Sequence, residues 1–189
     1  MNAEDIFRRI VFALETARIP YMLTGSFASA YHGTTRATQD IDLIIAPTTD
    51  QLQDFVRLLP STEYHVDLEA AREALRRQSQ FNVIDFATGW KIDLIIRKSR
   101  PFSIAEFERR VRGSFQGLPL YVASAEDMVV AKLEWAKLGN SQRQLEDVAH
   151  ILMIQTNLNR GYIERWVEDL KLESQWKSAC SIAKSTHDD

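Results

Sequence analysis

Two aliphatic runs, DIDLII at residues 40–45 and KIDLII at residues 91–96, most strongly limit what this chain can fold into. Short runs rich in isoleucine and leucine are typical of strands that are buried in a sheet. The second run follows FNVIDF at residues 81–86 across a short turn that contains Gly89, and this is the pattern of a β-hairpin. The chain is therefore expected to contain a β-sheet that includes these strands.

The remaining segments divide the chain into two parts. Residues 21–25 are predicted to form a short strand, residues 26–33 a short helix, and residues 114–123 a strand pair or one bent strand. The spacing of apolar residues predicts helices at 3–17, 49–59, 124–139, 142–156, 160–170 and 173–184. We therefore predict an α/β domain at residues 1–122 and a C-terminal helical bundle at residues 123–189 packed on it.

The composition is that of an ordinary globular protein. Of the 189 residues, 45% are hydrophobic and 26% are charged, and the formal net charge of −3 gives no global reason to expect nucleic-acid binding. The single cysteine, Cys180, excludes an intramolecular disulfide and fits a reducing compartment. The N-terminal segment lacks the pattern of a signal peptide, and no apolar run approaches the roughly 18 residues that span a bilayer. A cytoplasmic protein without membrane contact is expected.

Asp40 and Asp42 stand at the head of the first aliphatic run. Side chains alternate along a strand, so both carboxylates point to one face of the sheet and Ile41 points to the other. Two carboxylates a few ångströms apart repel each other unless a cation or strong hydrogen-bond donors lie between them. The pair therefore indicates either a wet acidic face on an edge strand or a cation site.

Gly25 and Ser26 favour the cation site, because they lie between a predicted strand and a predicted helix. Backbone N–H groups and the helix dipole at such a junction can bind an anion, and a glycine lets a phosphate approach the backbone. A serine there is also a routine helix N-cap. Asp93 adds a further carboxylate, because it heads the second aliphatic run as Asp42 heads the first.

These residues together predict magnesium-dependent chemistry on a phosphate. Mg²⁺ prefers oxygen ligands, usually carboxylates together with substrate phosphates and water. Two such ions about 4 Å apart can hold the attacking oxygen and the leaving pyrophosphate of an in-line displacement. We predict that Asp40, Asp42 and Asp93 are the catalytic metal ligands, and that Gly25 and Ser26 bind the phosphates of a nucleotide.

The order of these motifs resembles the nucleotidyltransferase superfamily with the DNA-polymerase-β-like fold. Within that superfamily, the segment RATQDID at residues 36–42 is similar to the abortive-infection nucleotidyltransferase toxins of the AbiEii type and their relatives. Lys132 and Asp147 match a lysine and an acidic residue that this family carries on helices after the sheet. The resemblance spans about residues 22–152.

The resemblance implies a mixed β-sheet flanked by helices and a magnesium-dependent transferase with two ions bound during turnover. The reaction would move a nucleoside monophosphate from an NTP to an acceptor hydroxyl, with pyrophosphate leaving. In some relatives the acceptor is the 3′ end of tRNA and the enzyme is the toxin of a toxin–antitoxin pair, so RNA and a cognate antitoxin are expected partners. The resemblance also implies that Arg36, Thr38, Lys132 and Asp147 bind the nucleotide.

Each of these four residues also has a purely structural interpretation. Arg36 and Thr38 share strand parity with the aspartates, but a surface arginine and a strand threonine would look the same. Lys132 suits a solvated position on its helix. Asp147 lies one helical turn from Arg143, which suits a surface ion pair.

Two further features stay open from the sequence. Whether Asp85 joins the carboxylates depends on the register of its strand. The basic stretch at residues 97–112 is either a solvated face or a contact for an RNA backbone.

Three functions fit these motifs. The first is a metal-dependent nucleotidyltransferase that acts on RNA or protein, with a toxin as one form of it. The second is the same chemistry on a small molecule, such as an antibiotic hydroxyl. The third is a nucleotide-binding or partner-binding module without turnover. The presence of all three carboxylates argues against the third, and the acceptor is not specified by the sequence.

Overall fold

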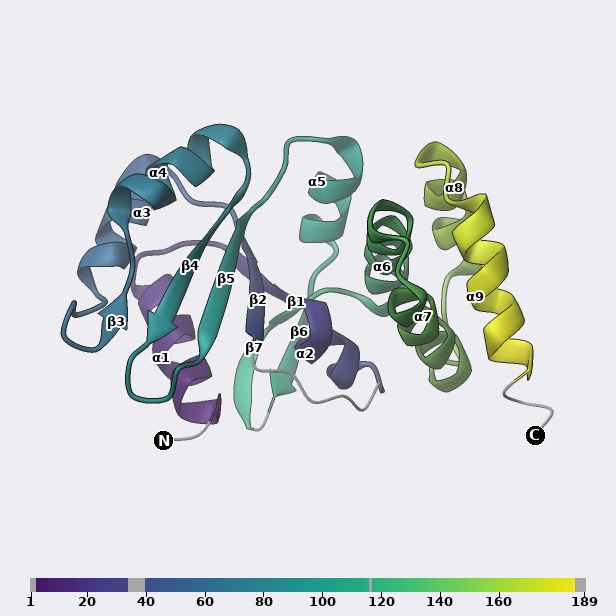
Figure 1. The fold of residues 1–189 in the computed structure, drawn as a ribbon, viewed down its shortest axis with the longest axis horizontal. Coiled ribbons are helices and arrows are strands. Elements are labelled where there is room, and N and C mark those ends of the chain that lie inside the picture. The colour runs from purple at the N-terminus through teal and green to yellow at the C-terminus, as the bar shows by residue number, and fades with distance from the viewer. Residues whose placement is uncertain (1–2, 34–39, 116, 186–189) are drawn as a thin grey trace. The chain divides into compact units, whose positions relative to one another are not determined.

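A computed structural model describes residues 3–33, 40–115 and 117–185 of the chain (Figure 1). These residues fall into two compact units. The first unit holds the described residues up to Phe27 and those from Asp40 to Val122. The second unit holds residues 28–33 and the described residues from Ala123 onward.

The first unit is built on a mixed sheet with the strand order β3-β4-β5-β2-β1-β7-β6. The strands are β1 (Tyr21–Thr24), β2 (Asp40–Ile45), β3 (Tyr64–His65), β4 (Gln80–Asp85), β5 (Lys91–Ile96), β6 (Val111–Phe115) and β7 (Leu118–Val122). β2 pairs with β5 and β1 pairs with β7 in parallel, whereas the other neighbours are antiparallel. The hairpin predicted from residues 81–96 is β4–β5, and the predicted strand pair near residues 114–123 is β6–β7.

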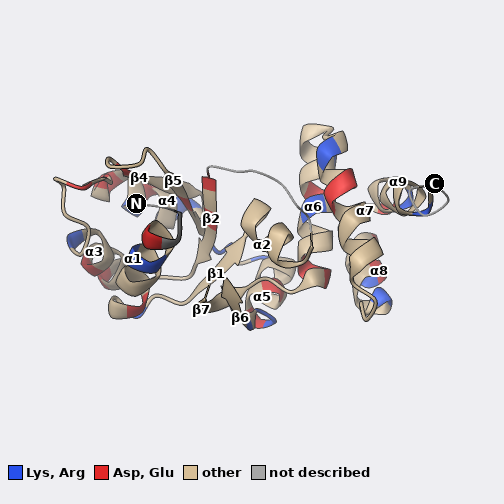
Figure 2. Cartoon of the chain, turned by 90° about the horizontal axis from the view of Figure 1, so that it is seen from below, with Lys and Arg blue, Asp and Glu red and all other residues tan. Residues whose placement is uncertain are grey.

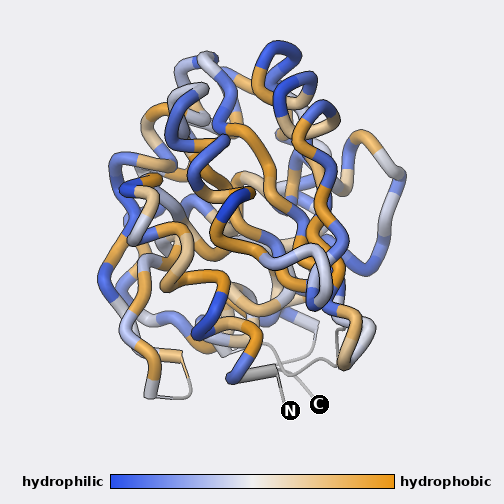
Figure 3. The backbone as a smooth tube through the Cα atoms, turned by 90° about the vertical axis from the view of Figure 1, so that its left-hand side faces the viewer, coloured by the Kyte–Doolittle hydropathy of each residue, from blue (hydrophilic) through white to orange (hydrophobic). Residues whose placement is uncertain are grey.

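Burial alternates along the central strand β2. Ile41, Leu43 and Ile45 are fully buried, whereas Asp40 and Asp42 lie on the other face of the sheet and are more exposed. Figure 3 shows that hydrophobic and hydrophilic segments alternate along the described part of the chain. The aliphatic residues therefore anchor β2 in the core while its acidic residues face outward from the same strand.

Three helices of the first unit pack together beside the sheet (Figure 1): α1 (Ala3–Thr16), α3 (Thr49–Arg57) and α4 (Leu68–Arg77). The sequence pattern does not predict α4 or α5 (Pro101–Glu108). α4 begins after Asp67, whose carboxylate accepts hydrogen bonds from the backbone N–H groups of Glu69 and Ala70. α5 begins with a proline, whose fixed φ suits the first turn, and buries residues on several sides, so it lacks an amphipathic period.

The second unit is a helical bundle of α6 (Ala125–Gly139), α7 (Gln142–Ile154), α8 (Arg160–Asp169) and α9 (Glu173–Ser185), as Figure 1 shows. The predicted cap of α6 is confirmed, because the Ser124 side chain accepts a hydrogen bond from the N–H of Asp127. The Asp127 carboxylate is fully buried and accepts from the Ser124 hydroxyl and from the Tyr162 hydroxyl, each at 2.5 Å. This network joins α8 to the start of α6.

The mixed sheet, its flanking helices and the C-terminal helical bundle confirm the predicted fold class. Among the described helices, none has the length and apolar character needed to cross a bilayer.

His32 ties the segment after α2 (Gly25–Tyr31) into the second unit. Its Nε2 lies 2.7 Å from the carbonyl oxygen of Ala123, and the Gln155 side chain donates to the His32 carbonyl at 3.0 Å. The His32 ring is 7% exposed. Burial lowers the pKa of His32 below its ordinary value, and this outweighs the opposing effects of the Ala123 carbonyl and Glu126. The ring is therefore held neutral at neutral pH.

We expect the free energy of unfolding to decrease as the pH falls below about 6.5, because the unfolded histidine then takes up a proton that the folded one resists. The stability from this group is complete above the unfolded pKa and is lost as the pH falls toward the lower folded pKa. His32→Gln keeps a donor for Ala123 but does not titrate. Urea unfolding at about pH 8 and about pH 5.5 should therefore show a smaller difference in this variant than in the wild type. His150→Gln, at an exposed position, is the matched control, and equal pH dependence in His32→Gln and wild type would contradict the assignment.

Candidate active site

The parallel pairing of β2 with β5 brings the predicted carboxylates together. Asp42 lies opposite Asp93, and Asp40 lies opposite Lys91. Residues that are directly opposite in neighbouring strands project from the same face of a sheet, so these four side chains share one face. On the other side of β2, Thr24 at the end of β1 lies opposite Asp42. Figure 2 shows acidic residues at the start of β2.

Lys91 neutralises part of this acidic face. Its Nζ lies 3.0 Å from Oδ2 of Asp93 and 3.7 Å from Oδ1 of Asp40. Asp93 is only 8% exposed, whereas Asp40 is exposed. The pKa of Lys91 is raised above its ordinary value, chiefly by the hydrogen bond to Asp93, so the ammonium stays charged.

Asp42 is a carboxylate whose negative charge is disfavoured by its surroundings. Burial, together with the nearby charges of Asp93 and Asp40, raises the pKa of Asp42 to about 6. The ammonium of Lys91 and a hydrogen bond from the backbone N–H of Ser26 act in the opposite direction. The folded protein therefore holds a carboxylate where its negative charge is disfavoured, and an added cation would relieve that cost.

Gly25 is the residue that lets Asp42 occupy this position. Its φ is +65°, a left-handed conformation that favours glycine. A Cβ atom at Gly25 would lie 2.0 Å from Oδ2 of Asp42, well inside van der Waals contact. The strand-to-helix turn at Gly25 and Ser26 thus closes directly against the carboxylate face, and the Ser26 N–H is directed at Asp42.

The carboxylate face fits a divalent cation by its donor atoms and by its charge. Its acidic side chains offer only oxygen ligands, as Mg²⁺ prefers, and three carboxylates face one ammonium. In the part of the chain that the structure describes, no three Asp, Glu, His or Cys side chains are already grouped around a single ion position. The ammonium of Lys91 contacts Asp40 and Asp93 and supplies the positive charge there.

Lys91 and Asn82 belong to this face, although they are not among the predicted site residues. Lys91 lies two residues before Asp93 on β5, so the alternation of side chains along a strand could have placed it on the same face as Asp93. Asn82 of β4 lies opposite Asp93 of β5. When the side-chain amide of Asn82 is oriented with its nitrogen toward Asp93, it donates a hydrogen bond to Oδ1 of Asp93 at 2.6 Å. No sequence signal pointed to Asn82, because the pairing of β4 with β5 had first to be known.

Lys132 and Asp147 lie in the second unit and pair with each other. The Nζ of Lys132 donates to Asp147 at 2.7 Å and to Gln144 at 3.1 Å. Lys132 is 4% exposed and Asp147 is 7% exposed, so the solvated lysine considered as an alternative is wrong. Arg36 and Thr38, which were also predicted to contact the nucleotide, lie outside the described residues.

The register of β4 settles the position of Asp85. Asp85 is opposite in parity to Asn82, so it lies on the face of the sheet away from the carboxylates. There one of its oxygens accepts from the backbone and hydroxyl of Thr88, and the other lies 3.9 Å from Nη2 of Arg9. Asp85 does not join the candidate site.

Arginines of the basic stretch at residues 97–112 lie over aromatic rings of the protein. The Arg110 guanidinium lies over the rings of Phe107 and Tyr121, at 4.4 Å and 5.0 Å from their centroids. Arg97 also lies over Phe107, and Arg112 lies over Tyr121. These arginines are stacked on the protein's own rings and are not fully solvated.

Comparison with known proteins places the fold. No family model matches the sequence, and no curated protein matches it significantly. Solved structures do resemble it. The antibiotic-resistance factor ANT(2'')-Ia is 14% identical with a TM-score of 0.51, and the match covers 97% of this chain and 95% of that chain.

Two further structures are similar over most of their length. An antigenic nucleotidyltransferase-like protein from Paracoccidioides brasiliensis is 15% identical with a TM-score of 0.56, and the match covers 91% of each chain. The lincosamide antibiotic adenylyltransferase LnuA, bound to lincomycin, is 13% identical with a TM-score of 0.53, covering 82% of this chain and 99% of that chain. The chain therefore has the nucleotidyltransferase fold.

Proposed function

We propose that this protein is a magnesium-dependent nucleotidyltransferase that moves a nucleoside monophosphate from an NTP to an acceptor hydroxyl. One observation carries the proposal. Asp40, Asp42 and Asp93 share one face of adjacent parallel strands, directly against the Gly25–Ser26 turn, within a nucleotidyltransferase fold. A cluster of carboxylates beside a glycine turn is what a metal–triphosphate complex requires.

Each residue has a role in this proposal. Asp40, Asp42 and Asp93 would hold Mg²⁺, two ions during turnover, which would neutralise the charge on the attacking oxygen and the leaving pyrophosphate. Gly25 and Ser26 would contact the phosphates, with Arg36, Thr38, Lys132 and Asp147 as further nucleotide-binding residues implied by the sequence resemblance. Lys132 and Asp147 also hold α6 to α7 through their buried ion pair.

Lys91 offsets the repulsion among the carboxylates in the metal-free protein. Lys91→Met removes the ammonium that contacts Asp93 and Asp40 and keeps most of the side-chain volume. In EDTA we expect the melting temperature to fall by about 2–4 °C, because a partly exposed ion pair contributes roughly 1 kcal/mol. Added Mg²⁺ should raise the melting temperature more in Lys91→Met than in the wild type, as measured by scanning fluorimetry.

The exposed Lys98→Met is the control for this variant, and it should follow the wild type with and without Mg²⁺. The same Mg²⁺ response in Lys91→Met and wild type would show that the ammonium does not substitute for a metal.

Two classes of acceptor are candidates. The resemblance to AbiEii-type toxins favours RNA, in particular the 3′ end of tRNA, and a toxin paired with an antitoxin. The similarity in fold to LnuA, which was solved with lincomycin bound, favours a small-molecule hydroxyl as the second candidate.

The experiment tests the two acceptor classes in parallel reactions. Each α-labelled NTP is incubated with Mg²⁺ and the protein, together with total tRNA in one arm and a panel of aminoglycosides and lincosamides in another. We expect label on one of these acceptors and none with Asp42→Asn prepared in parallel. Label on a drug but not on RNA selects the small-molecule function. NTP binding without a labelled product in any RNA, protein or small-molecule pool favours a nucleotide-binding module without turnover.

A further inference from the structure

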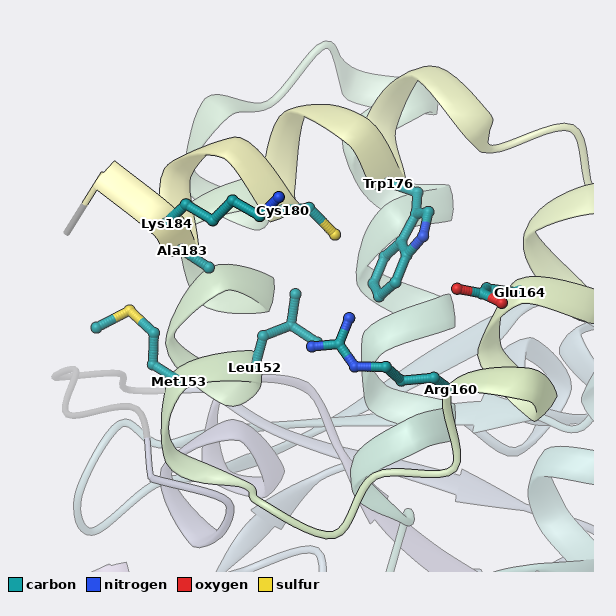
Figure 4. Close-up of a pocket in the computed structure, with 8 residues that line it drawn as sticks. All are labelled: Leu152, Met153, Arg160, Glu164, Trp176, Cys180, Ala183 and Lys184. Atoms are coloured by element: carbon teal, nitrogen blue, oxygen red, sulfur yellow. The ribbon is translucent and has the colours of Figure 1, made fainter. Parts of the chain in front are cut away.

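The helical unit contains a hollow that the nucleotidyltransferase proposal does not use (Figure 4). It lies among the end of α7, α8 and α9 and has a volume of about 690 Å³. Volumes of about 300–1,000 Å³ are usual for sites that bind small organic molecules. All of its lining residues belong to the second unit.

The middle of α9 presents a small side chain to the hollow. Trp176, Cys180 and Lys184 recur at four-residue spacing, so they line one face of α9. The small thiol of Cys180 stands between the indole and the lysine, and it leaves space that a larger residue would fill. On α8, Arg160 and Glu164 have the same spacing and border the opposite side.

Two cations converge on this space. Figure 4 shows the Arg160 guanidinium extending toward Leu152 and the Lys184 side chain running toward Cys180. Within the described residues, neither cation forms an ion pair or a side-chain hydrogen bond. Burial raises the pKa of the Cys180 thiol. The positive charges of Arg160 and Lys184 lower this pKa and the negative charge of Glu164 raises it, so all three charges act on the Cys180 thiol. Two positive charges against one negative charge favour an anion.

The rest of the lining is apolar and aromatic. The Trp176 ring is half-buried, and Leu152 adds aliphatic surface below it. A flat ring can stack on an indole, while a guanidinium and an ammonium can bind the oxygens of an acidic group. We propose that this hollow binds an aromatic acid, with its carboxylate or phosphate between Arg160 and Lys184 and its ring against Trp176.

Cys180 makes the proposal directly testable, because it is the chain's single cysteine and lies inside the hollow. A bound molecule would shield the thiol from alkylation. The probes are 2-naphthoate, 2-naphthyl phosphate and the neutral 2-naphthalenemethanol. The rate of Cys180 alkylation by iodoacetamide is measured by mass spectrometry at increasing probe concentrations. The concentration that halves this rate is the half-protecting concentration of the probe.

We expect at least one of the two naphthyl acids to slow alkylation with half-protection below about 1 mM, and the neutral alcohol to protect at least about tenfold more weakly. The stronger of the two acids identifies carboxylate or phosphate as the preferred group. Arg160→Gln with Lys184→Gln should raise the half-protecting concentration by at least about tenfold. Each variant is normalised to its own unprotected rate, because both cations also affect the thiol's reactivity.

Lys177→Gln is the matched control, since Lys177 is an exposed lysine of the same helix that does not line the hollow. It should show wild-type protection, and circular dichroism should show all variants folded. The proposal is overturned if neither acid protects Cys180, if the alcohol protects equally well, or if the double variant is protected like the wild type. None of these results depends on whether the first unit transfers nucleotides.

Discussion

Asp42→Asn should reduce the rate of nucleotidyl transfer at least about 100-fold, because loss of one charged element that positions the metals is expected to cost that much. The amide keeps the shape of the side chain, and its oxygen can still accept the hydrogen bond from the Ser26 N–H. What the variant loses is the negative charge that would hold the metals. Single-turnover transfer of label from an NTP, with saturating Mg²⁺, measures this effect.

The same substitution should stabilise the metal-free protein. Burial and the charges of Asp93 and Asp40 raise the pKa of Asp42 from 3.8 to about 6, so the folded state disfavours the ionised form. The wild type loses stability relative to Asp42→Asn as the pH rises through that window, and the difference is complete above it. We expect Asp42→Asn to be more stable by about 1–2 kcal/mol near neutral pH in EDTA.

Mg²⁺ should then raise the melting temperature of the wild type and have little effect on Asp42→Asn. Asp54→Asn makes the same chemical change at an exposed position of α3, and it should match the wild type in transfer and in its response to Mg²⁺. Wild-type activity in Asp42→Asn would contradict the proposed role of Asp42 in holding the metals. Lower stability of Asp42→Asn in EDTA would show that the carboxylate is not under electrostatic stress.

Gly25→Ala should also reduce transfer at least about 100-fold, because its added methyl group displaces the Asp42 carboxylate from the site. The new Cβ would lie 2.0 Å from Oδ2 of Asp42, and the left-handed φ of +65° would strain any side chain. The strain alone should lower the free energy of unfolding by about 1–2 kcal/mol. Transfer assays and urea unfolding on the same preparation separate the two effects.

Gly89→Ala is the matched control for Gly25→Ala. Gly89 has a similar φ of +71°, but nothing lies within 4 Å of a Cβ atom placed there. Gly89→Ala should therefore show a similar loss of stability and retain wild-type transfer. Equal activity of the two glycine variants would mean that the contact between Gly25 and Asp42 does not matter for catalysis.

Local chemistry explains what could be predicted from the sequence alone. The two-residue period of a strand is enough to place Asp40 and Asp42 on one face, and the β4–β5 hairpin follows from its apolar runs and its glycine turn. The Ser124 cap and the end of α6 at Gly139 were also predictable, because helix ends depend on neighbouring residues. These features involve contacts between residues close in sequence.

Only the tertiary structure decided the contacts between distant segments. Strand register brought Lys91 among the carboxylates and sent Asp85 to the opposite face, since a shift of one residue reverses every side chain of a strand. The packing of α6 against α7 buries Lys132 as the partner of Asp147, which excludes the solvated position that the sequence left open as an alternative. The sequence thus determined which side chains could carry the chemistry. Long-range pairing determined which of them meet, because burial of the aliphatic face, and not local propensity, selects the register.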